Sequence, residues 1–455
     1  MDLKYLFKPS TMAVIGVSTS QDSHPANVIY NKNHLRYPVK TFPVNPRGGF
    51  INREPLYRSV KEIEEKIDMA VIAVRGEFVP NVLEECIKKG VKGAVIVSGG
   101  FAESGNMELQ QRVADMAEEA SFPFIGPNCL GIYSPDYVDT FFLPGERIIS
   151  PKKGNIGFVS QSGGVLVDQM VKFAGQGIGI SLAVSIGNKA CTRETDMIDW
   201  FEKDDQTKVI TFYIEGFEKG EGRKFIERAD QCSKPVVILK AGKSRKGIEA
   251  ASSHTASLAG DYRVFSEIMK QFHVAEADNE YELTSFCEAL SCYADGITGN
   301  VGIISLSGGH GVIAADACGL HGLEIPVLEK KTMDTIRENL TLPIRNIVSL
   351  VNPIDLTGSS VDEDIMTAAR HLFRDKNIEC VLTLLIPYSP GVSTDIGAKL
   401  SQVARNEGKP LIAYVPNEEK YRIIIEGFEL NNVPVASSVE GAVLMAKALK
   451  RCIPC

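Results

Sequence analysis

Residues 154–164 read GNIGFVSQSGG, and residues 299–309 read GNVGIISLSGG. Each copy is a short apolar run, typical of a buried strand, followed by a Ser-Gly-Gly turn and a helix-like segment. Internal similarity of this length indicates a duplicated structural unit. The repeat therefore predicts two related α/β domains in which parallel strands are covered by helices.

Later segments extend the correspondence between the two copies. Residues 234–239 (KPVVIL) resemble residues 409–414 (KPLIAY). Turn-forming residues such as Asp295-Gly296 separate the copies. We therefore place the two related domains at residues 150–290 and 298–455.

The first 145 residues also alternate between short apolar segments and helix-like segments. The predicted strands are residues 13–15, 39–44, 69–74, 94–97 and 124–125, and two predicted helices are residues 79–89 and 107–120. This pattern predicts a Rossmann-like domain over residues 1–145. A linker rich in Pro, Gly, Ser and Lys follows at residues 144–153.

The composition is that of a folded globular protein, because 44% of the 455 residues are hydrophobic and 23% are charged. The net charge of −8 gives no general attraction to nucleic acids or anionic membranes. No apolar run approaches the ~18 residues of a membrane span, and the first residues lack a secretory signal. We therefore expect a cytoplasmic protein whose ten scattered cysteines are reduced, with Cys452–Cys455 as an ordinary tail.

The turn Ser162-Gly163-Gly164 is a candidate phosphate site. Glycine lets a ligand approach the backbone, and the free N–H groups and dipole of the following helix attract anions. Ser162 adds a hydroxyl donor. The alternative is an ordinary strand-to-helix turn, and we assign the second copy, residues 307–309, a structural role first.

The first turn, residues 14–20, lacks the further glycines of a dinucleotide fingerprint. No acidic residue follows the second strand, where Val44 leads into Asn45, Pro46 and Arg47. NAD is therefore disfavoured. Two interpretations remain open: a nucleotide with an extra phosphate, paired with Arg47 and Lys40, or an ordinary turn without a ligand.

His254 is the candidate catalytic histidine among the seven in the chain. It lies in a run of small residues, 250–261, that we expect to be a movable loop, and it follows a basic loop that would favour phosphate. Glu215 directly follows the apolar strand over residues 209–214, so it can accept a hydrogen bond from one ring nitrogen while the other acts as nucleophile. The alternative is an exposed loop histidine and a capping glutamate.

Several motifs in one order resemble a known family, the NDP-forming acyl-CoA synthetases, relatives of succinyl-CoA synthetase. The likeness covers nearly the whole chain and is greatest to the α subunit of the ADP-forming acetyl-CoA synthetases. The motifs are residues 14–16 (VIG), 43–46 (PVNP), 126–131 (GPNCLG), 157–164 (GFVSQSGG), 213–216 (YIEG), 252–255 (SSHT) and 352–358 (NPIDLTG).

The resemblance implies a CoA-binding first domain and two ligase-type domains of flavodoxin-like topology. It implies that His254 carries the phosphoryl group, that Glu215 is its partner, and that phosphate binds at Ser162, Gly163 and Gly164. Acyl-CoA and phosphate would form an acyl phosphate, which phosphorylates His254 and then ADP. ADP or ATP, with Mg²⁺, would bind an ATP-grasp β subunit in an α2β2 assembly, and this chain would hold no metal.

The same resemblance assigns a CoA site in the first domain. Its nucleotide part would be lined by Gly16, Ser18, Asn45, Pro46 and Arg47. The pantetheine arm and thioester would be lined by Ser98, Gly99, Asn128 and Cys129. The sequence does not identify the carboxylic acid, and acetate is the expectation at the level of the family.

Two other functions stay open on the sequence. A serine hydrolase would use Ser162, Glu215 and His254, although its turn needs glycine where Ser160 stands. A non-catalytic CoA or acyl-CoA sensor is suggested only by departures from the family pattern near Gly16 and at Arg75; a further departure, at His310, lies in the third domain.

Overall fold

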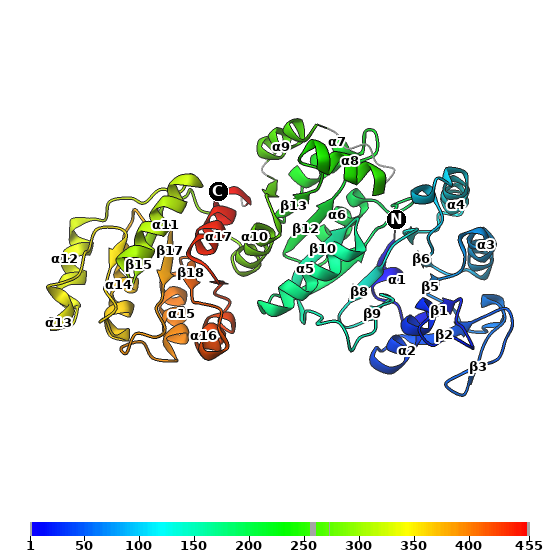
Figure 1. Ribbon diagram of the computed structural model, residues 1–455, viewed down its shortest axis with the longest axis horizontal. Coiled ribbons are helices and arrows are strands. Elements are labelled where there is room, and N and C mark those ends of the chain that lie inside the picture. Colours follow the sequence, from blue (N-terminus) through cyan, green and yellow to red (C-terminus); the bar gives the residue numbers. More distant parts are fainter. Residues whose placement is uncertain (1, 255–260, 273, 453–455) are drawn as a thin grey trace. The chain divides into compact units, whose positions relative to one another are not determined.

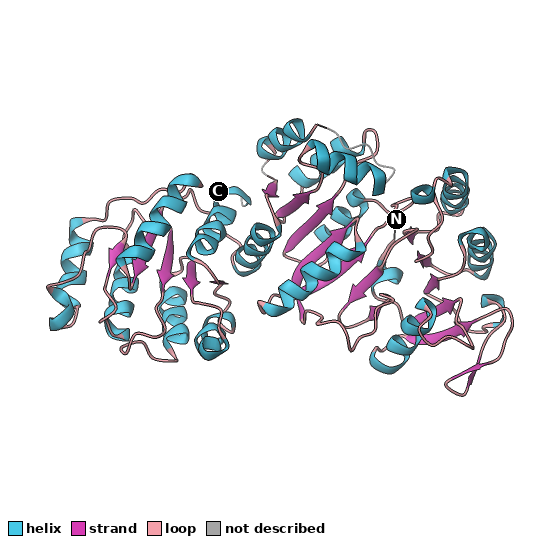
Figure 2. Cartoon of the chain, viewed as in Figure 1, coloured by secondary structure: helices cyan, strands magenta, loops and turns pink. Residues whose placement is uncertain are grey.

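The computed structural model describes residues 2–254, 261–272 and 274–452, with side chains left out at 251–254, 451 and 452. The chain forms two compact units, Met1–Glu276 and Ala277–Cys455 (Figure 1). Helices and strands alternate through both units (Figure 2). The predicted α/β class is thus confirmed.

The first sheet is parallel and has the strand order β2-β1-β5-β6-β7. Its strands are β1 (Thr11–Ile15), β2 (Lys40–Val44), β5 (Met69–Ile72), β6 (Gly93–Ile96) and β7 (Phe124–Ile125). The helices are α1 (Lys4–Phe7), α2 (Pro25–Arg36), α3 (Val79–Lys89) and α4 (Met107–Glu119), and a hairpin is formed by β3 (Phe50–Ile51) and β4 (Glu54–Pro55). Met12 and Val14 belong to one buried cluster and Ala13 and Ile15 to another, as expected for a strand buried on both faces.

The second sheet has the order β14-β13-β12-β10-β11-β8-β9. Its strands are β8 (Gly131–Ser134), β9 (Val138–Asp139), β10 (Lys153–Ser160), β11 (Ile180–Ser185), β12 (Val209–Ile214), β13 (Val236–Lys240) and β14 (Ala275–Ala277). Its helices are α5 (Gly163–Gly175), α6 (Glu194–Lys203), α7 (Glu221–Asp230), α8 (Arg245–His254) and α9 (Tyr262–Gln271). Strand β8 runs antiparallel to β11, so a segment before residue 145 completes this sheet.

The third sheet lies in the second unit and has the order β16-β15-β17-β18-β19. Its strands are β15 (Val301–Ser305), β16 (Ile354–Asp355), β17 (Cys380–Leu384), β18 (Leu411–Tyr414) and β19 (Val435–Ala436). The helices are α10 (Glu280–Cys292), α11 (Gly308–Leu320), α12 (Lys330–Asn339), α13 (Leu342–Arg345), α14 (Asp362–Arg374), α15 (Ile396–Glu407), α16 (Arg422–Glu429) and α17 (Val439–Cys452).

Apart from β8 and β9, the strands of each sheet follow the order 2-1-3-4-5, which is flavodoxin-like. The two sequence repeats form the first strand, turn and helix of the second and third sheets. Their turns share a hydrogen-bond pattern, because Ser160 Oγ bonds Ser162 N and O as Ser305 Oγ bonds Ser307 N and O. The two copies therefore share a strand order and a turn geometry as well as a sequence pattern.

One local expectation is wrong. Residues 250–254, expected in a loop, complete helix α8. Alanine-rich sequence favours helix, and Glu249 pairs with Lys246 at 2.7 Å and with Arg245 at 3.4 Å on the same helix. Residues 255–260, the rest of that predicted loop, lie outside the described residues.

Candidate active site

The N-terminus of α5 forms one side of the candidate site. Ser162 Oγ accepts a hydrogen bond from Val165 N at 3.4 Å. A Cβ atom at Gly164 would meet nothing within 4 Å, whereas one at Gly163 would lie 3.0 Å from Leu130 Cβ. Gly164 therefore leaves the backbone at the helix end open to a ligand, and the helix end favours anions.

Ser162 does not have the backbone of a hydrolase nucleophile. Its φ of −107° and ψ of 124° are ordinary extended values, and its side chain caps α5. A nucleophile elbow instead places serine on a strained turn with its hydroxyl exposed. The structure therefore gives no support to the hydrolase hypothesis.

Glu215 lies at the carboxyl end of β12, beside the end of β10. Gln161 Oε1 accepts hydrogen bonds from the backbone N–H groups of Glu215 at 2.7 Å and Gly216 at 3.1 Å. Gln161 Nε2 donates to Gly216 O at 2.8 Å. One buried side chain thus holds both peptide groups of the turn, which fixes the backbone that carries the Glu215 carboxylate.

Two buried lysines complete this arrangement. Lys240 Nζ donates to Glu215 O at 2.7 Å, and Lys189 Nζ donates to Gly216 O at 2.8 Å. Lys189 also pairs with Glu194 Oε1 at 2.6 Å, and both side chains are less than 10% exposed. The backbone N–H and C=O groups at Glu215 and Gly216 are therefore all bonded by side chains of the second sheet and its loops.

His254 is the last residue of α8, and its side chain lies outside the described residues, as does any contact of its imidazole with Glu215. Helix α8 follows β13, whose neighbour β12 ends at Ile214, just before Glu215. The role of His254 stays a prediction.

The predicted CoA residues of the first domain lie at the carboxyl ends of its strands. Gly16 follows β1 with φ +108°, and a Cβ there would lie 2.3 Å from Ala73 O, so only glycine allows this close approach. Asn45 Nδ2 donates to Val17 O at 2.6 Å. This bond connects the loops after β1 and β2 next to the point where the strand order reverses, the usual ligand crevice of such sheets.

The other predicted nucleotide-binding residues surround the same loops. Ser18 N donates to Asn27 Oδ1 at 2.6 Å, and Ser18 Oγ accepts from Gln21 N at 3.1 Å. Pro46 and Arg47 are exposed, and Arg47 N donates to Asn45 Oδ1 at 2.8 Å. The Arg47 guanidinium is thus on the surface beside the crevice.

The predicted pantetheine residues divide into exposed and buried groups. Asn128 N donates to Ser98 O at 2.9 Å, and both Gly99 and Asn128 are exposed. Cys129 faces inward instead, where its thiol donates to Ile96 O at 3.3 Å and burial raises its pKa to about 12. Of Cys129, only the backbone is available to line a ligand.

The carboxyl edges of the first two sheets are connected within the first unit. Leu130 N donates to Ser185 Oγ at 3.1 Å, which joins the loop after β7 to the end of β11. Asn188 Nδ2 donates to Glu103 Oε2 at 2.6 Å, and Asn188 N donates to Pro127 O at 2.9 Å. The loop carrying Asn128 therefore lies against the loop that follows β11 and close to the start of α5.

Sequence reasoning did not assign roles to Gln161, Lys189 or Asn188. It placed Lys240 in the basic loop, residues 240–246, whereas the structure buries this lysine at the end of β13. The sequence contained one indication for Lys240: a lysine at the end of an apolar strand is rarely buried, so a buried one has a specific role. It contained none for Lys189 and Asn188, because the bonds of Lys189 to Gly216 and of Asn188 to Glu103 and Pro127 join distant parts of the chain.

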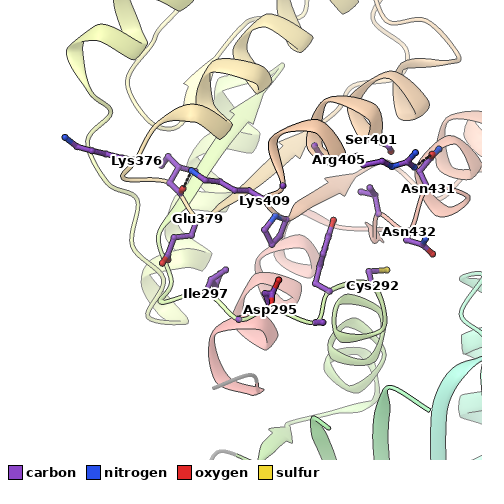
Figure 3. Close-up of a pocket in the computed structure, with 18 residues that line it drawn as sticks. Cys292, Asp295, Ile297, Lys376, Glu379, Ser401, Arg405, Lys409, Asn431 and Asn432 are labelled. Atoms are coloured by element: carbon purple, nitrogen blue, oxygen red, sulfur yellow. Dashed lines mark hydrogen bonds between the residues drawn. The ribbon is translucent and has the colours of Figure 1, made fainter. Parts of the chain in front are cut away.

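A separate cavity of about 630 Å³ lies in the second unit (Figure 3). It lies where β17 and β18 begin, the end of the sheet opposite to the usual ligand crevice, and no predicted site residue lines it. Its cations bond the protein itself: Lys409 Nζ donates to Asp375 O at 2.8 Å, and Arg405 Nη2 donates to Asn431 Oδ1 at 2.6 Å. These contacts stabilise the helix ends and loops gathered there.

Two kinds of site are absent from the described residues. None of the described helices combines the length and apolar character required to traverse a bilayer. Within the same residues, no three His, Cys, Asp or Glu side chains are grouped as metal ligands.

Two family descriptions match the chain. "CoA binding domain" matches residues 10–135, and "Succinyl-CoA ligase like flavodoxin domain" matches residues 153–290. The first two sheets are therefore a CoA-binding domain and a ligase-type domain.

Similarity to individual proteins gives a narrower protein class than the two domain descriptions. The chain is 38% identical over 391 residues to "Acetate--CoA ligase [ADP-forming] I" of Archaeoglobus fulgidus. The aligned region covers 85% of this chain and 55% of that protein. This chain thus spans about half the length of that relative. It is 34% identical to "Acetate--CoA ligase [ADP-forming] II subunit alpha" of Pyrococcus furiosus, over 98% of this chain and 97% of that one.

A solved structure agrees with these relatives. It is the dinucleotide-forming acetyl-coenzyme A synthetase 1 of Candidatus Korarchaeum cryptofilum in complex with phosphate and ADP. The TM-score is 0.88 at 28% identity, over 98% of this chain and 96% of that chain. The chain belongs to the ADP-forming acyl-CoA synthetase family and corresponds to its α subunit.

Proposed function

We propose that this chain is the α subunit of an ADP-forming acyl-CoA synthetase that interconverts acyl-CoA, ADP and phosphate with the free acid, CoA and ATP. Acetyl-CoA is the proposed acyl donor. The observation that carries the proposal is the junction of the two carboxyl edges, where the first-domain loop at Asn128 adjoins the start of α5. A thioester held by the first domain would there meet a phosphate held by the second.

The proposed chemistry has three transfers. A phosphate oxygen attacks the thioester carbonyl, the C–S bond breaks, and CoA leaves as its thiolate. One imidazole nitrogen of His254 then attacks the acyl phosphate, the P–O bond to the acyl group breaks, and the carboxylate leaves. Finally an oxygen of the ADP β-phosphate attacks this phosphorus, the N–P bond breaks, and ATP forms.

The chain's own residues would bind and orient these groups. The start of α5 at Ser162, Gly163 and Gly164 would hold the phosphoryl group by its N–H groups and hydroxyl. Glu215 would accept the proton of the second imidazole nitrogen and so fix the tautomer in which the first is a nucleophile. Because the backbone N–H and C=O groups of Glu215 are both hydrogen-bonded, the Glu215 carboxylate would be preorganised for this task.

The CoA crevice fits a phosphate-rich nucleotide. Gly16 has no Cβ, which allows the backbone to pack closely where the nucleotide would lie, and exposed Arg47 would pair with a phosphate. Ser18, Asn45 and Pro46 would line the same part. Ser98, Gly99, Asn128 and the backbone of Cys129 would line the pantetheine arm.

A partner would complete the reaction. The similarity of almost the whole chain to a protein called an α subunit supports a second subunit. We propose that this partner is an ATP-grasp β subunit that binds ADP or ATP with Mg²⁺, in an α2β2 assembly.

The test is phosphorylation of the full chain. Incubation with acetyl-CoA and ³²P-phosphate should label the wild-type chain with acid-labile phosphate. The His254→Ala chain should not be labelled, whereas His371→Ala, which changes a partly exposed histidine on α14 of the second unit, should be labelled normally.

Two outcomes would contradict the proposal. Labelling of His254→Ala would move the phosphoryl carrier elsewhere. CoA binding without phosphotransfer, even with a co-expressed ATP-grasp subunit, would instead favour the CoA-sensor hypothesis. The reconstituted complex also allows a panel of carboxylic acids to be compared by CoA- and ATP-dependent thioester formation.

A further inference from the structure

Lys240 lies at the carboxyl end of β13, where it pairs with Ile214, the last residue of β12 before Glu215. Its side chain is buried, with 6% of the residue exposed. Its ammonium donates to Glu215 O at 2.7 Å and to Ala241 O. A buried lysine is costly unless its charge has partners, so its position at this turn needs a reason.

The duplicated domain shows that the fold does not require this lysine. The aligned repeats place Leu306 where Gln161 stands and Val415 where Lys240 stands. The strand register places Ile386 where Glu215 stands, since Ser160 pairs with Tyr213 as Ser305 pairs with Leu384. All three replacements are apolar and buried, with exposed fractions of 2% for Leu306, 7% for Ile386 and 0% for Val415.

The same strand ends thus pack well with apolar side chains. The polar set Gln161, Glu215 and Lys240 belongs only to the copy that carries the proposed phosphohistidine segment. By contrast, Lys234 and Lys409, which lie two residues before the equivalent strands β13 and β18, occupy the same position in both copies and bond carbonyl groups in each. Lysines that occur in both copies, Lys234 and Lys409, support the fold that the copies share. Lys240 occurs in one copy only, so its role belongs to the site that this copy carries.

The charges around Lys240 come from each element packed against it. Glu215 at the end of β12 and Glu276 in β14 attract its ammonium, while Lys189 and Lys243 repel it. The ring of Phe265 in α9 lies 5.9 Å from the ammonium. Burial outweighs the attraction and lowers the pKa of Lys240 to about 8.

We propose that Lys240 is a positioning residue for Glu215: its ammonium holds the Glu215–Gly216 turn and keeps the neighbouring carboxylate charged, ready to orient His254. The inference rests on the proposed function of His254 and Glu215. Coulombic attraction favours the ionised form of both partners, so loss of the ammonium would leave the carboxylate easier to protonate.

The experiment compares three variants of the full chain in the acetyl-CoA and ³²P-phosphate labelling assay between pH 5.5 and 9.5. Lys240→Met removes the charge at similar length, and Lys240→Arg keeps it. Lys234→Met is the matched control, because it removes a lysine that bonds two carbonyls at the other end of the same strand. Far-UV circular dichroism confirms folding of each.

We expect Lys240→Met to be labelled roughly tenfold more slowly than Lys234→Met at pH 7, with its acid limb moved to higher pH. Wild-type labelling should fall as the pH rises through about 8, where Lys240 loses its proton. Lys240→Arg should restore labelling and move this alkaline limb upward by a pH unit or more, because guanidinium stays protonated.

The outcomes separate the two proposals. An unlabelled wild-type chain overturns the proposed function and the role of Lys240 with it. A labelled wild-type chain with Lys240→Met equal to Lys234→Met in rate and pH profile overturns the role of Lys240 alone. If Lys240→Met does not fold, an unchanged alkaline limb in Lys240→Arg overturns it.

Discussion

At the scale of single residues, the structure explains why Gly16 is glycine. Its φ is positive, and a Cβ at this position would lie 2.3 Å from Ala73 O, which leaves no room for a side chain. The close packing of the loops after β1 and β5 therefore depends on this one residue.

We expect Gly16→Ala to lower the free energy of unfolding by about 1–3 kcal/mol, since both strain and a backbone clash oppose the change. CoA affinity should fall as well, because the loop must move. Urea unfolding and calorimetric CoA titration measure the two effects. Gly175→Ala is the control: a Cβ at this last residue of α5 meets no atom within 4 Å, and it should be neutral or stabilising.

At the scale of elements, Lys234 and Lys409, the lysines found in both copies, each connect the start of a strand to the end of a helix. Lys234 Nζ donates to Phe201 O at 2.6 Å and Asp204 O at 2.8 Å, at the end of α6. Lys409 Nζ makes the same kind of bonds to Asp375 O and Ile378 O, after α14.

We expect Lys234→Met and Lys409→Met each to cost about 1–2 kcal/mol, because two carbonyl groups lose a charged donor. The effect should be local. Amide hydrogen exchange should quicken near the end of α6 in the first variant and near the end of α14 in the second. If either variant showed an equal increase in exchange rate near both helix ends, the two lysines would not act locally and independently.

At the scale of the whole molecule, α10 belongs to the second unit. Glu282 pairs with Lys447 of α17, and Glu288 Oε1 accepts from Val435 N at 2.7 Å. Among the described residues, Glu288 Oε2 has no hydrogen-bond partner. Burial, with a smaller contribution from Glu429, raises the pKa of Glu288 to about 8, while the Val435 bond opposes the shift.

This raised pKa makes the second unit less stable as the pH rises. Near pH 4 the carboxyl binds its proton in both folded and unfolded chains. Between about 4.5 and 8 the unfolded carboxyl ionises first, so stability falls by about 1.4 kcal/mol per unit of pKa difference, a few kcal/mol in total. Glu288→Gln should flatten this dependence in urea unfolding at pH 5 and 8.5. Exposed Glu118→Gln should leave it unchanged.

Much of the architecture follows from local patterns in the sequence. The predicted helix at residues 79–89 coincides with α3, and the predicted strands of the first domain match its sheet. Glu215, Gly16 and Ser162 could be found because each lies within two residues of the end of an apolar strand. Cys129 could not be placed correctly, because the direction of its thiol depends on packing under the loop rather than on its motif.

The sequence by itself determined the repeated strand–turn–helix units, the order of the strands along the chain and the glycine-rich turns, because these follow from local apolar periodicity and backbone freedom. Only the tertiary structure decided which side chains hold those turns. Gln161, Lys189 and Lys240 meet at the Glu215–Gly216 turn from separate strand ends and loops. Hydrogen bonds between residues distant in sequence leave no local pattern from which to predict them.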